Sequence, residues 1–121
     1  MGRMLGMFRS KKDRKRKAIN VARVPDGMRV YAIGDIHGRH DLMKQLIKQI
    51  DEDDAARGAA STHIIFLGDL VDRGPDSAGV IDRAIKLKKK RGHNVQFLMG
   101  NHEELFLKAC RQPDKKVARF F

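Results

Sequence analysis

Three short apolar runs, each ending in a glycine that a polar side chain follows at once, are the feature that most constrains the fold of this 121-residue chain. The runs stand in "MRVYAIGDIHG" from residue 28, "THIIFLGDLVDRG" from residue 62 and "VQFLMGNHE" from residue 95. Asp35 and Asp69 are 34 residues apart, and Asp69 and Asn101 are 32 apart. Each interval is about the length of one β-α-β repeat, which predicts parallel strands joined by helices.

The segments between and after these runs have apolar residues at helical spacing. Strands are expected at 28–33, 62–67 and 95–99. Helices are expected at 40–53, 75–91 and 103–111. The helix from 75 ends in "KLKKKR", which suits the negative end of a helix dipole, and Gly92 follows as a stop signal. The order β-α-β-α-β-α predicts an α/β fold with a helix-covered parallel sheet.

The polar residues that follow the three glycines form a candidate metal site. Ligands gather at the carboxyl ends of parallel strands, and all three motifs lie there. The glycines would let the chain turn sharply at this edge. Carboxylate, amide and imidazole donors without a thiolate suit Mn²⁺, Fe or Zn²⁺. Asp35 and His37, two apart on a segment expected to be extended, would point the same way and share one cation. Asp69 could bridge to a second cation about 3.5–4 Å away, which Asn101 would also bind.

Each motif also has a purely structural explanation. Asp and Asn favour turns and helix N-caps, so any one motif alone would be weak evidence. The coincidence of three of them at one sheet edge favours the metal site. Among the other polar residues, His40 is expected at the surface, and Glu103 and Glu104 are expected only to complement a helix dipole. His63 and His93 fall at strand beginnings, away from the site, and are interpreted as structural.

The motifs "GDIHG", "GDLVDRG" and "GNHE" resemble those of the calcineurin-like metallophosphoesterases. The "DRG" and "NHE" endings resemble the phosphoprotein phosphatase branch, with its serine/threonine phosphatases and the similar bacterial diadenosine tetraphosphatases. The resemblance covers roughly residues 28–107. It implies that the chain is the N-terminal β-α-β-α-β-α half of a four-layer αββα sandwich rather than a doubly wound sheet.

The resemblance implies roles for the residues that match. Asp35 and His37 would bind the first metal ion, Asp69 would bridge, and Asn101 would bind the second.

On the substrate side, the resemblance implies that Arg73 grips the phosphate oxygens, that His102 is the general acid and that Asp72 orients His102. Arg39 is placed to reach a phosphate as well, although the family usually has other residues at this position. The alternative for Arg39 is an ordinary solvated side chain.

The implied activity is metal-dependent hydrolysis of phosphomonoesters by two-metal hydroxide attack. The first interpretation is a serine/threonine protein phosphatase that acts on phosphorylated proteins. The alternative is a dinucleoside tetraphosphatase, which acts on a small phosphoester substrate. The family also needs two further histidines for its second metal, and no histidine follows His102. We therefore expect residues 25–121 to be a truncated domain with weak activity and marginal stability.

A basic segment precedes this domain. The formal net charge is +11, and residues 1–17 carry eight Lys or Arg against Asp13 alone. Such a block is expected to be a solvated, disordered tail over residues 1–24. It could also bind an anionic partner. This leaves open a function of another class, an inactive basic module that binds nucleic acid or an anionic surface.

Cysteine content and hydropathy bear on the compartment. Cys110 is the single cysteine, so an internal disulfide is excluded, and it is expected to be a buried thiol on a helical face. No apolar run approaches the ~20 residues of a membrane span. A cytoplasmic location is the default expectation.

Overall fold

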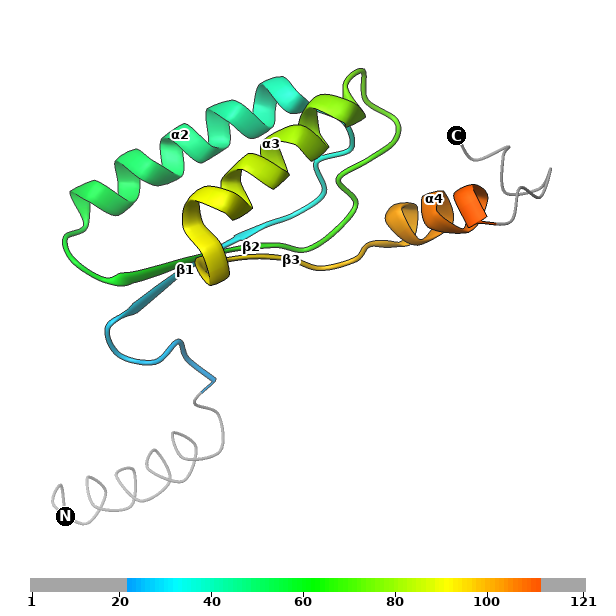
Figure 1. The fold of residues 1–121 in the computed structure, drawn as a ribbon. Coiled ribbons are helices and arrows are strands. Elements are labelled where there is room, and N and C mark those ends of the chain that lie inside the picture. The colour runs from blue at the N-terminus through cyan, green and yellow to red at the C-terminus, as the bar shows by residue number, and fades with distance from the viewer. Residues whose placement is uncertain (1–21, 112–121) are drawn as a thin grey trace, which may run out of the picture.

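The computed structural model describes residues 22–111 (Figure 1). Strands β1 (Met28–Ile33), β2 (Ser61–Phe66) and β3 (Val95–Phe97) form one parallel sheet in the order β1-β2-β3. The helices are α2 (His40–Ala56), α3 (Ser77–Arg91) and α4 (Asn101–Arg111), with a short 3-10 helix η1 (Gly92–Asn94) before β3. Most of the expected basic tail, and residues 112–121, lie outside the described residues.

The predicted β-α-β-α-β-α order and parallel sheet are confirmed. Several boundaries differ by one to three residues from those expected, and two of the differences have a physical reason. Helix α2 runs to Ala56, three residues further than expected, because Arg29 donates to the terminal carbonyl oxygens of Asp54 and Arg57. Strand β3 ends at Phe97, since the following residues bend toward the loop that leaves β2.

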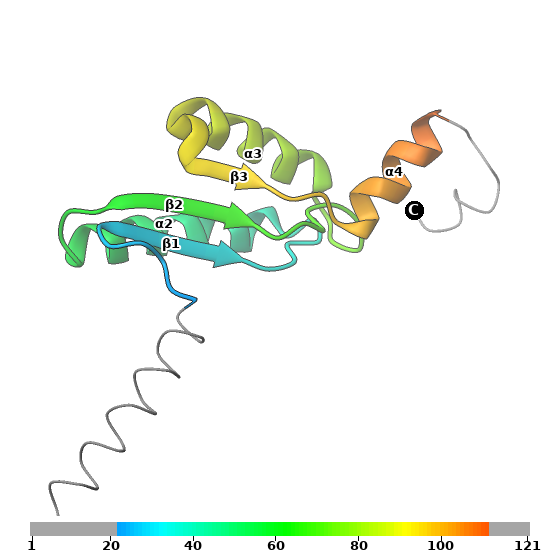
Figure 2. The same cartoon turned by 90° about the horizontal axis from the view of Figure 1, so that it is seen from below.

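Helices α2 and α3 pack on the same face of the sheet (Figures 1 and 2). Two right-handed crossovers that advance in one direction, from β1 to β2 to β3, put both helices on one side. The buried core lies between these layers, and Phe66, which is fully buried, stacks on Phe97 with ring centroids 4.7 Å apart. The core consists of Ile33, Ile36, Met43, Ile50, Ile64, Phe66, Leu70, Val71, Val80, Ala84, Leu87 and Val95.

The opposite face of the sheet is not covered by any element of residues 22–111 (Figure 2). Strand alternation turns Ala32 and Ile65 to this side, where Ala32 is exposed and Ile65 half-buried. Leu67 and Leu98, just past the strand ends, are 52% and 51% exposed. One face of this sheet is therefore open and partly apolar, with His63 and Gln96 among its polar residues.

Helix α4 extends beyond the sheet edge and buries none of its side chains among the described residues. The expectation of a buried thiol is accordingly wrong, because Cys110 is exposed on this helix. None of the helices in the described part of the chain is long and apolar enough to cross a membrane.

The carboxyl end of α2 is tied to the sheet through Asp54. Its Oδ1 accepts from Thr62 Oγ1 at 2.6 Å and from Arg29 Nη1 at 2.6 Å. These two hydrogen bonds, Thr62 first, hold the pKa of the Asp54 carboxyl below its ordinary value of 3.8. Ionised Asp54 therefore stabilises the junction between α2, β1 and β2.

This junction predicts a loss of stability in acid. A carboxyl whose folded pKa is lowered contributes stability that is fully present above the unfolded pKa and is lost as pH falls through the folded value. We expect the urea midpoint to fall as pH decreases below about 4, and Asp54→Asn to flatten that dependence. Unfolding between pH 2.5 and 5 measures this, with the exposed Asp82→Asn as matched control. An Asp54→Asn profile as steep as that of the unsubstituted chain would contradict the assignment.

Candidate metal centre

Three loops meet at the carboxyl edge of the sheet. They are the first loop (residues 34–39), the second loop (residues 67–76) and the third loop (residues 98–100), which follow β1, β2 and β3. The carbonyl oxygen of Asp69 accepts from the N–H groups of Ile36 and His37 at 3.1 and 3.0 Å. Gly38 donates to the Leu70 carbonyl oxygen at 2.8 Å. Backbone hydrogen bonds thus extend the β1–β2 pairing past the strand ends and hold the first two loops together.

Close backbone approach explains two of the three glycines that end the apolar runs. Gly68 has φ +108°, and a Cβ there would lie 2.6 Å from the backbone nitrogen of Gly100. A Cβ on Gly100 would in turn collide with the Asp69 carboxylate. Gly34 differs, since it has open space around it and no positive φ. The glycines at 68 and 100 let the second and third loops touch.

Strained backbone is concentrated in the residues that the sequence singled out. Among residues 22–111, the non-glycine residues with positive φ are His37 (45°), Asp69 (52°), Asp72 (71°) and Arg73 (69°). Such conformations are uncommon for residues with a Cβ, cost on the order of 1–3 kcal/mol each, and cluster at functional sites. The extended segment expected around His37 is therefore wrong, because the chain turns there into the left-handed region.

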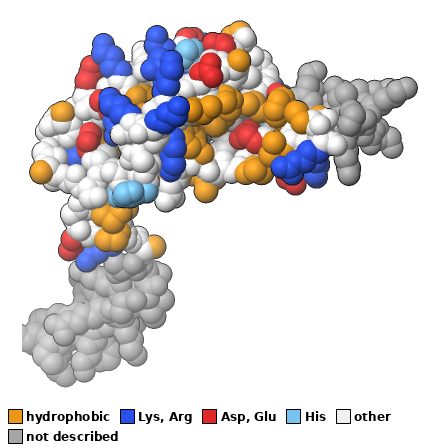
Figure 3. All heavy atoms as spheres, viewed as in Figure 1, with side chains coloured by type: hydrophobic (Ala, Val, Ile, Leu, Met, Phe, Trp, Pro, Cys, Tyr) orange, Lys and Arg blue, Asp and Glu red, His pale blue; other side chains and the backbone are white. Residues whose placement is uncertain are grey.

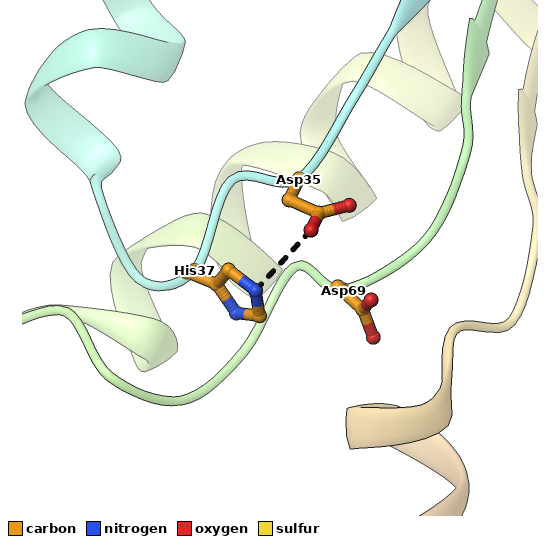
Figure 4. A group of neighbouring side chains, drawn as sticks. All are labelled: Asp35, His37 and Asp69. Carbon is orange, nitrogen blue, oxygen red and sulfur yellow. Dashed lines mark ion pairs between the residues drawn. The ribbon is translucent and has the colours of Figure 1, made fainter.

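Asp35, His37 and Asp69 form a group that could hold a metal ion. One potential ligand atom from each lies within 4.8 Å of the others, and Figure 4 shows the three side chains on neighbouring loops. His37 Nδ1 is 3.0 Å from the Val71 carbonyl oxygen, which can only accept, so Nδ1 carries the proton. In the neutral ring Nε2 is then an acceptor, and it lies 3.4 Å from Asp35 Oδ2. Two electron-pair donors that face each other fit a shared cation.

Asn101 extends this group from the first residue of α4. With its amide turned so that Nδ2 faces Asp69, it donates to both carboxylate oxygens at 2.9 Å. If Oδ1 faces Asp69 instead, three acceptor oxygens lie close together. A bound cation would then be needed to offset their mutual repulsion. The Asp69 carboxylate therefore lies between the Asp35–His37 pair and Asn101.

His102 and Asp72 form a second, more enclosed pair beside the carboxylates. His102 Nδ1 is 3.1 Å from Asp72 Oδ2, and the two side chains are 12% and 14% exposed. The backbone N–H of His102 also donates to Asp69 Oδ1 at 3.0 Å. The rings of His102 and His37 meet edge to face, with their centroids 4.8 Å apart. This packing fixes the His102 ring next to the candidate metal ligands.

The two arginines proposed from the sequence differ in their surroundings. Arg73 is exposed in the second loop and forms no ion pair with any residue from 22 to 111, which leaves its guanidinium available. Arg39 donates through Nε and Nη2 to both oxygens of Asp41 at 3.0 and 2.9 Å. This pairing lowers the pKa of Asp41 to about 2. Arg39 is thus engaged by Asp41 rather than by a residue of the candidate centre.

Glu103 has a role that the sequence interpretation missed. Its two carboxylate oxygens accept from the Leu70 N–H at 3.2 Å, and Oε1 also accepts from the Gly100 N–H at 3.3 Å. Beyond complementing the α4 dipole, Glu103 ties the second loop to the third. Half of a capping-box signal was present, because a Glu three residues after the N-cap position can accept the N–H of that residue, here Gly100.

Comparison with known proteins identifies the family. The family model of calcineurin-like phosphoesterases matches residues 28–120. The chain belongs to this family. The resemblance inferred from "GDIHG", "GDLVDRG" and "GNHE" is therefore confirmed.

Individual relatives of this calcineurin-like chain are phosphoesterases of several kinds. It is 35% identical over 92 residues to a symmetrical bis(5'-nucleosyl)-tetraphosphatase of Delftia acidovorans, covering 76% of this chain and 29% of the relative. It is 36% identical over 70 residues to the serine/threonine-protein phosphatase BSL2 of Arabidopsis thaliana, covering 58% of this chain and 7% of the relative. The crystal structure of a protein described as a candidate diadenosine tetraphosphatase superposes with a TM-score of 0.54 at 29% identity, covering 79% of this chain and 38% of that one. The chain thus spans less than a third of the tetraphosphatase that it matches.

The donor set predicts cation binding that depends on Asp69. We expect the chain to bind Mn²⁺, and Asp69→Asn to weaken binding about 100-fold, because the central carboxylate becomes neutral while its size is kept. Loss of the free Mn²⁺ signal in electron paramagnetic resonance titrations measures the affinity. Asp82→Asn, an exposed carboxylate on α3, is the matched control and should bind normally. Equal affinity of the Asp69→Asn and Asp82→Asn variants would exclude Asp69 as a ligand.

Proposed function

We propose that the protein containing this chain is a metal-dependent hydrolase of phosphoanhydride and phosphoester bonds. The observation that carries the proposal is the convergence of Asp35, His37 and Asp69 at one point, with the His102–Asp72 pair beside them. Three oxygen and nitrogen donors next to an enclosed imidazole–carboxylate pair match the needs of phosphoryl transfer, which are charge neutralisation and proton supply.

The proposed ligands divide between two divalent cations, for which Mn²⁺, Fe and Zn²⁺ are the candidates. Asp35, His37 and Asp69 would hold the first, and Asp69 and Asn101 the second. The cations, when bound, supply Lewis acidity that activates water and neutralises charge on the phosphoryl oxygens. The chain's own part is to orient these donors. The Val71 carbonyl does so for His37 by fixing its proton on Nδ1.

His102 is the proposed general acid. With Nδ1–H donating to Asp72, its other ring nitrogen Nε2 is left to deliver a proton to the departing oxygen. Asp72 keeps the ring in this tautomer and stabilises its charged form. Because both side chains are largely buried, the hydrogen bond is shielded from water and holds the ring in one orientation.

Arg73 is the proposed phosphate-binding residue. A guanidinium offers two parallel N–H donors that match two oxygens of a phosphoryl group. Arg73 follows Asp72 directly, so the proposed phosphate-binding residue and the carboxylate that orients His102 come from one strained turn. Arg39 could contribute only after releasing Asp41.

The proposed substrate class is the dinucleoside tetraphosphates. The first interpretation, a serine/threonine protein phosphatase, is less well supported than its alternative, because the relatives with the longer matches are tetraphosphatases. In a symmetrical cleavage, a water oxygen bonds to an inner phosphorus while the central bridging P–O bond breaks. The departing nucleoside diphosphate takes a proton, and the products are two nucleoside diphosphates.

Phosphoserine and phosphothreonine in proteins form the second candidate class. The specific observation for it is the similarity, 36% identity over 70 residues, to the serine/threonine-protein phosphatase BSL2 of Arabidopsis thaliana. The same residues would act in the same order, with a serine or threonine alkoxide as the leaving group that His102 protonates.

The test uses the protein that contains this chain, and measures hydrolysis of diadenosine tetraphosphate with Mn²⁺, followed as ADP by chromatography, beside phosphate release from a phosphoserine peptide. We expect ADP as product and a loss of about 10²–10⁴ in kcat for His102→Asn, the contribution of a positioned general acid. Asp82→Asn should keep full activity. Release of phosphate from the peptide alone would favour the second class. Hydrolysis that His102→Asn and Asp69→Asn leave unchanged would contradict the proposal.

A further inference from the structure

A histidine–carboxylate contact joins the start of α2 to the end of the second loop, outside the candidate metal centre. His40 Nδ1 is 3.1 Å from Asp76 Oδ2. We propose that this pair is a clamp that holds the first and second loops in their active arrangement, so that His40 is a positioning residue for the metal ligands. The inference rests on the proposed function, because it assigns His40 to that same site.

Contacts with α3 hold the Asp76 side chain in place independently of His40. As the N-cap of α3, it accepts the Gly79 N–H through Oδ1 at 2.8 Å. Its carboxylate lies directly against Gly79, where any Cβ would collide with it. One carboxylate oxygen therefore caps α3, and the other faces His40. A rigid acceptor makes the contact directional.

His40 is held just as closely on its side. It is the first residue of α2, directly after the first loop, and its side chain is 27% exposed. Nε2 is buried and has no partner among the described residues, so the ring that fits carries its proton on Nδ1 and donates to Asp76. His40 is partly exposed, as expected of a surface residue, but the contact with Asp76 was not predicted.

The His40–Asp76 clamp joins the ends of the two loops that contain the strained residues. Beside it, the Asp76 N–H donates to the Gly38 carbonyl oxygen at 3.0 Å, and Gly38 packs on Gly74. Within residues 22–111, His40–Asp76 is the one hydrogen bond between side chains that links the first turn of α2 to the second loop. The span that it secures includes His37 on one side and the Asp72–Arg73 turn on the other.

The strained backbone of the two loops explains how the clamp acts on the candidate metal centre. Positive φ values at His37, Asp72 and Arg73 persist only where surrounding contacts hold the backbone in place. If the two loops separate, these residues can relax, and the ligand atoms of His37 and Asp69 move apart. The hydrogen bond to the Asp76 carboxylate therefore opposes the relaxation of these strained residues.

Four variants of the full chain test the clamp. His40→Phe removes the donor and keeps a ring, whereas His40→Asn keeps a donor at the position of Nδ1. Asp76→Ser keeps an N-cap for α3 and removes the second oxygen. His93→Phe makes the same ring substitution at an exposed residue of η1, at the opposite end of the sheet, and is the control. Two quantities are measured for each, the Mn²⁺ affinity and the amide hydrogen exchange of Gly38 and Asp76 in the metal-free chain.

We expect His40→Phe and Asp76→Ser each to weaken Mn²⁺ binding about tenfold and to speed exchange at Gly38 by a similar factor. A fifth variant, which combines His40→Phe with Asp76→Ser, should be no worse than either single one, and His40→Asn should stay within about twofold of the unsubstituted chain. If His40→Phe does not fold, the Asp76→Ser and His40→Asn variants decide. Thermal destabilisation with unchanged affinity and exchange would overturn the clamp. Faster exchange in a chain that never binds Mn²⁺ would support the clamp and contradict the proposed function.

Discussion

The close approach of three backbone segments at the carboxyl edge of the sheet is the constraint on which the rest of the site depends. One carbonyl oxygen, that of Asp69, accepts two N–H groups from the first loop, and the glycines at 68 and 100 let the third loop reach the second. Side chains that are distant in sequence become neighbours only because these contacts exist. The sheet itself is ordinary, and its two helices cover a single face.

Charge distribution supports the same interpretation of this edge. Electron-pair donors of Asp35, His37 and Asp69 face one another, while Figure 3 shows most of the lysine and arginine side chains of the visible face gathered over the helices. Helix α4 packs little, yet its first residues contribute Asn101, His102 and Glu103 to the site. A helix with no buried side chain among the described residues is thus held at its N-terminus by polar contacts. The proposed catalytic pair and the candidate metal ligands meet at the Asp69 carboxylate, which accepts the backbone N–H of His102.

The spacing of the three motifs was enough to predict the fold and to group the residues of the candidate site. The intervals between Asp35, Asp69 and Asn101 predicted parallel strands whose carboxyl ends meet. Contacts that depend on individual side-chain rotamers and on loop geometry could not be predicted from the sequence. Periodicity carries no information on the left-handed turn at His37 or on the approach of His40 to Asp76. Exposure of Cys110 was missed because an apolar helical stripe indicates burial only where a neighbour covers it.

The most direct measurement is anomalous diffraction from crystals of the chain grown with Mn²⁺. Peaks at the manganese edge are expected between the Asp35, His37 and Asp69 side chains, and between those of Asp69 and Asn101. The His37 ring should keep Nδ1 on the Val71 carbonyl and turn Nε2 to the first peak. A map with no peak at this edge of the sheet, or with manganese bound only elsewhere, would contradict the metal centre.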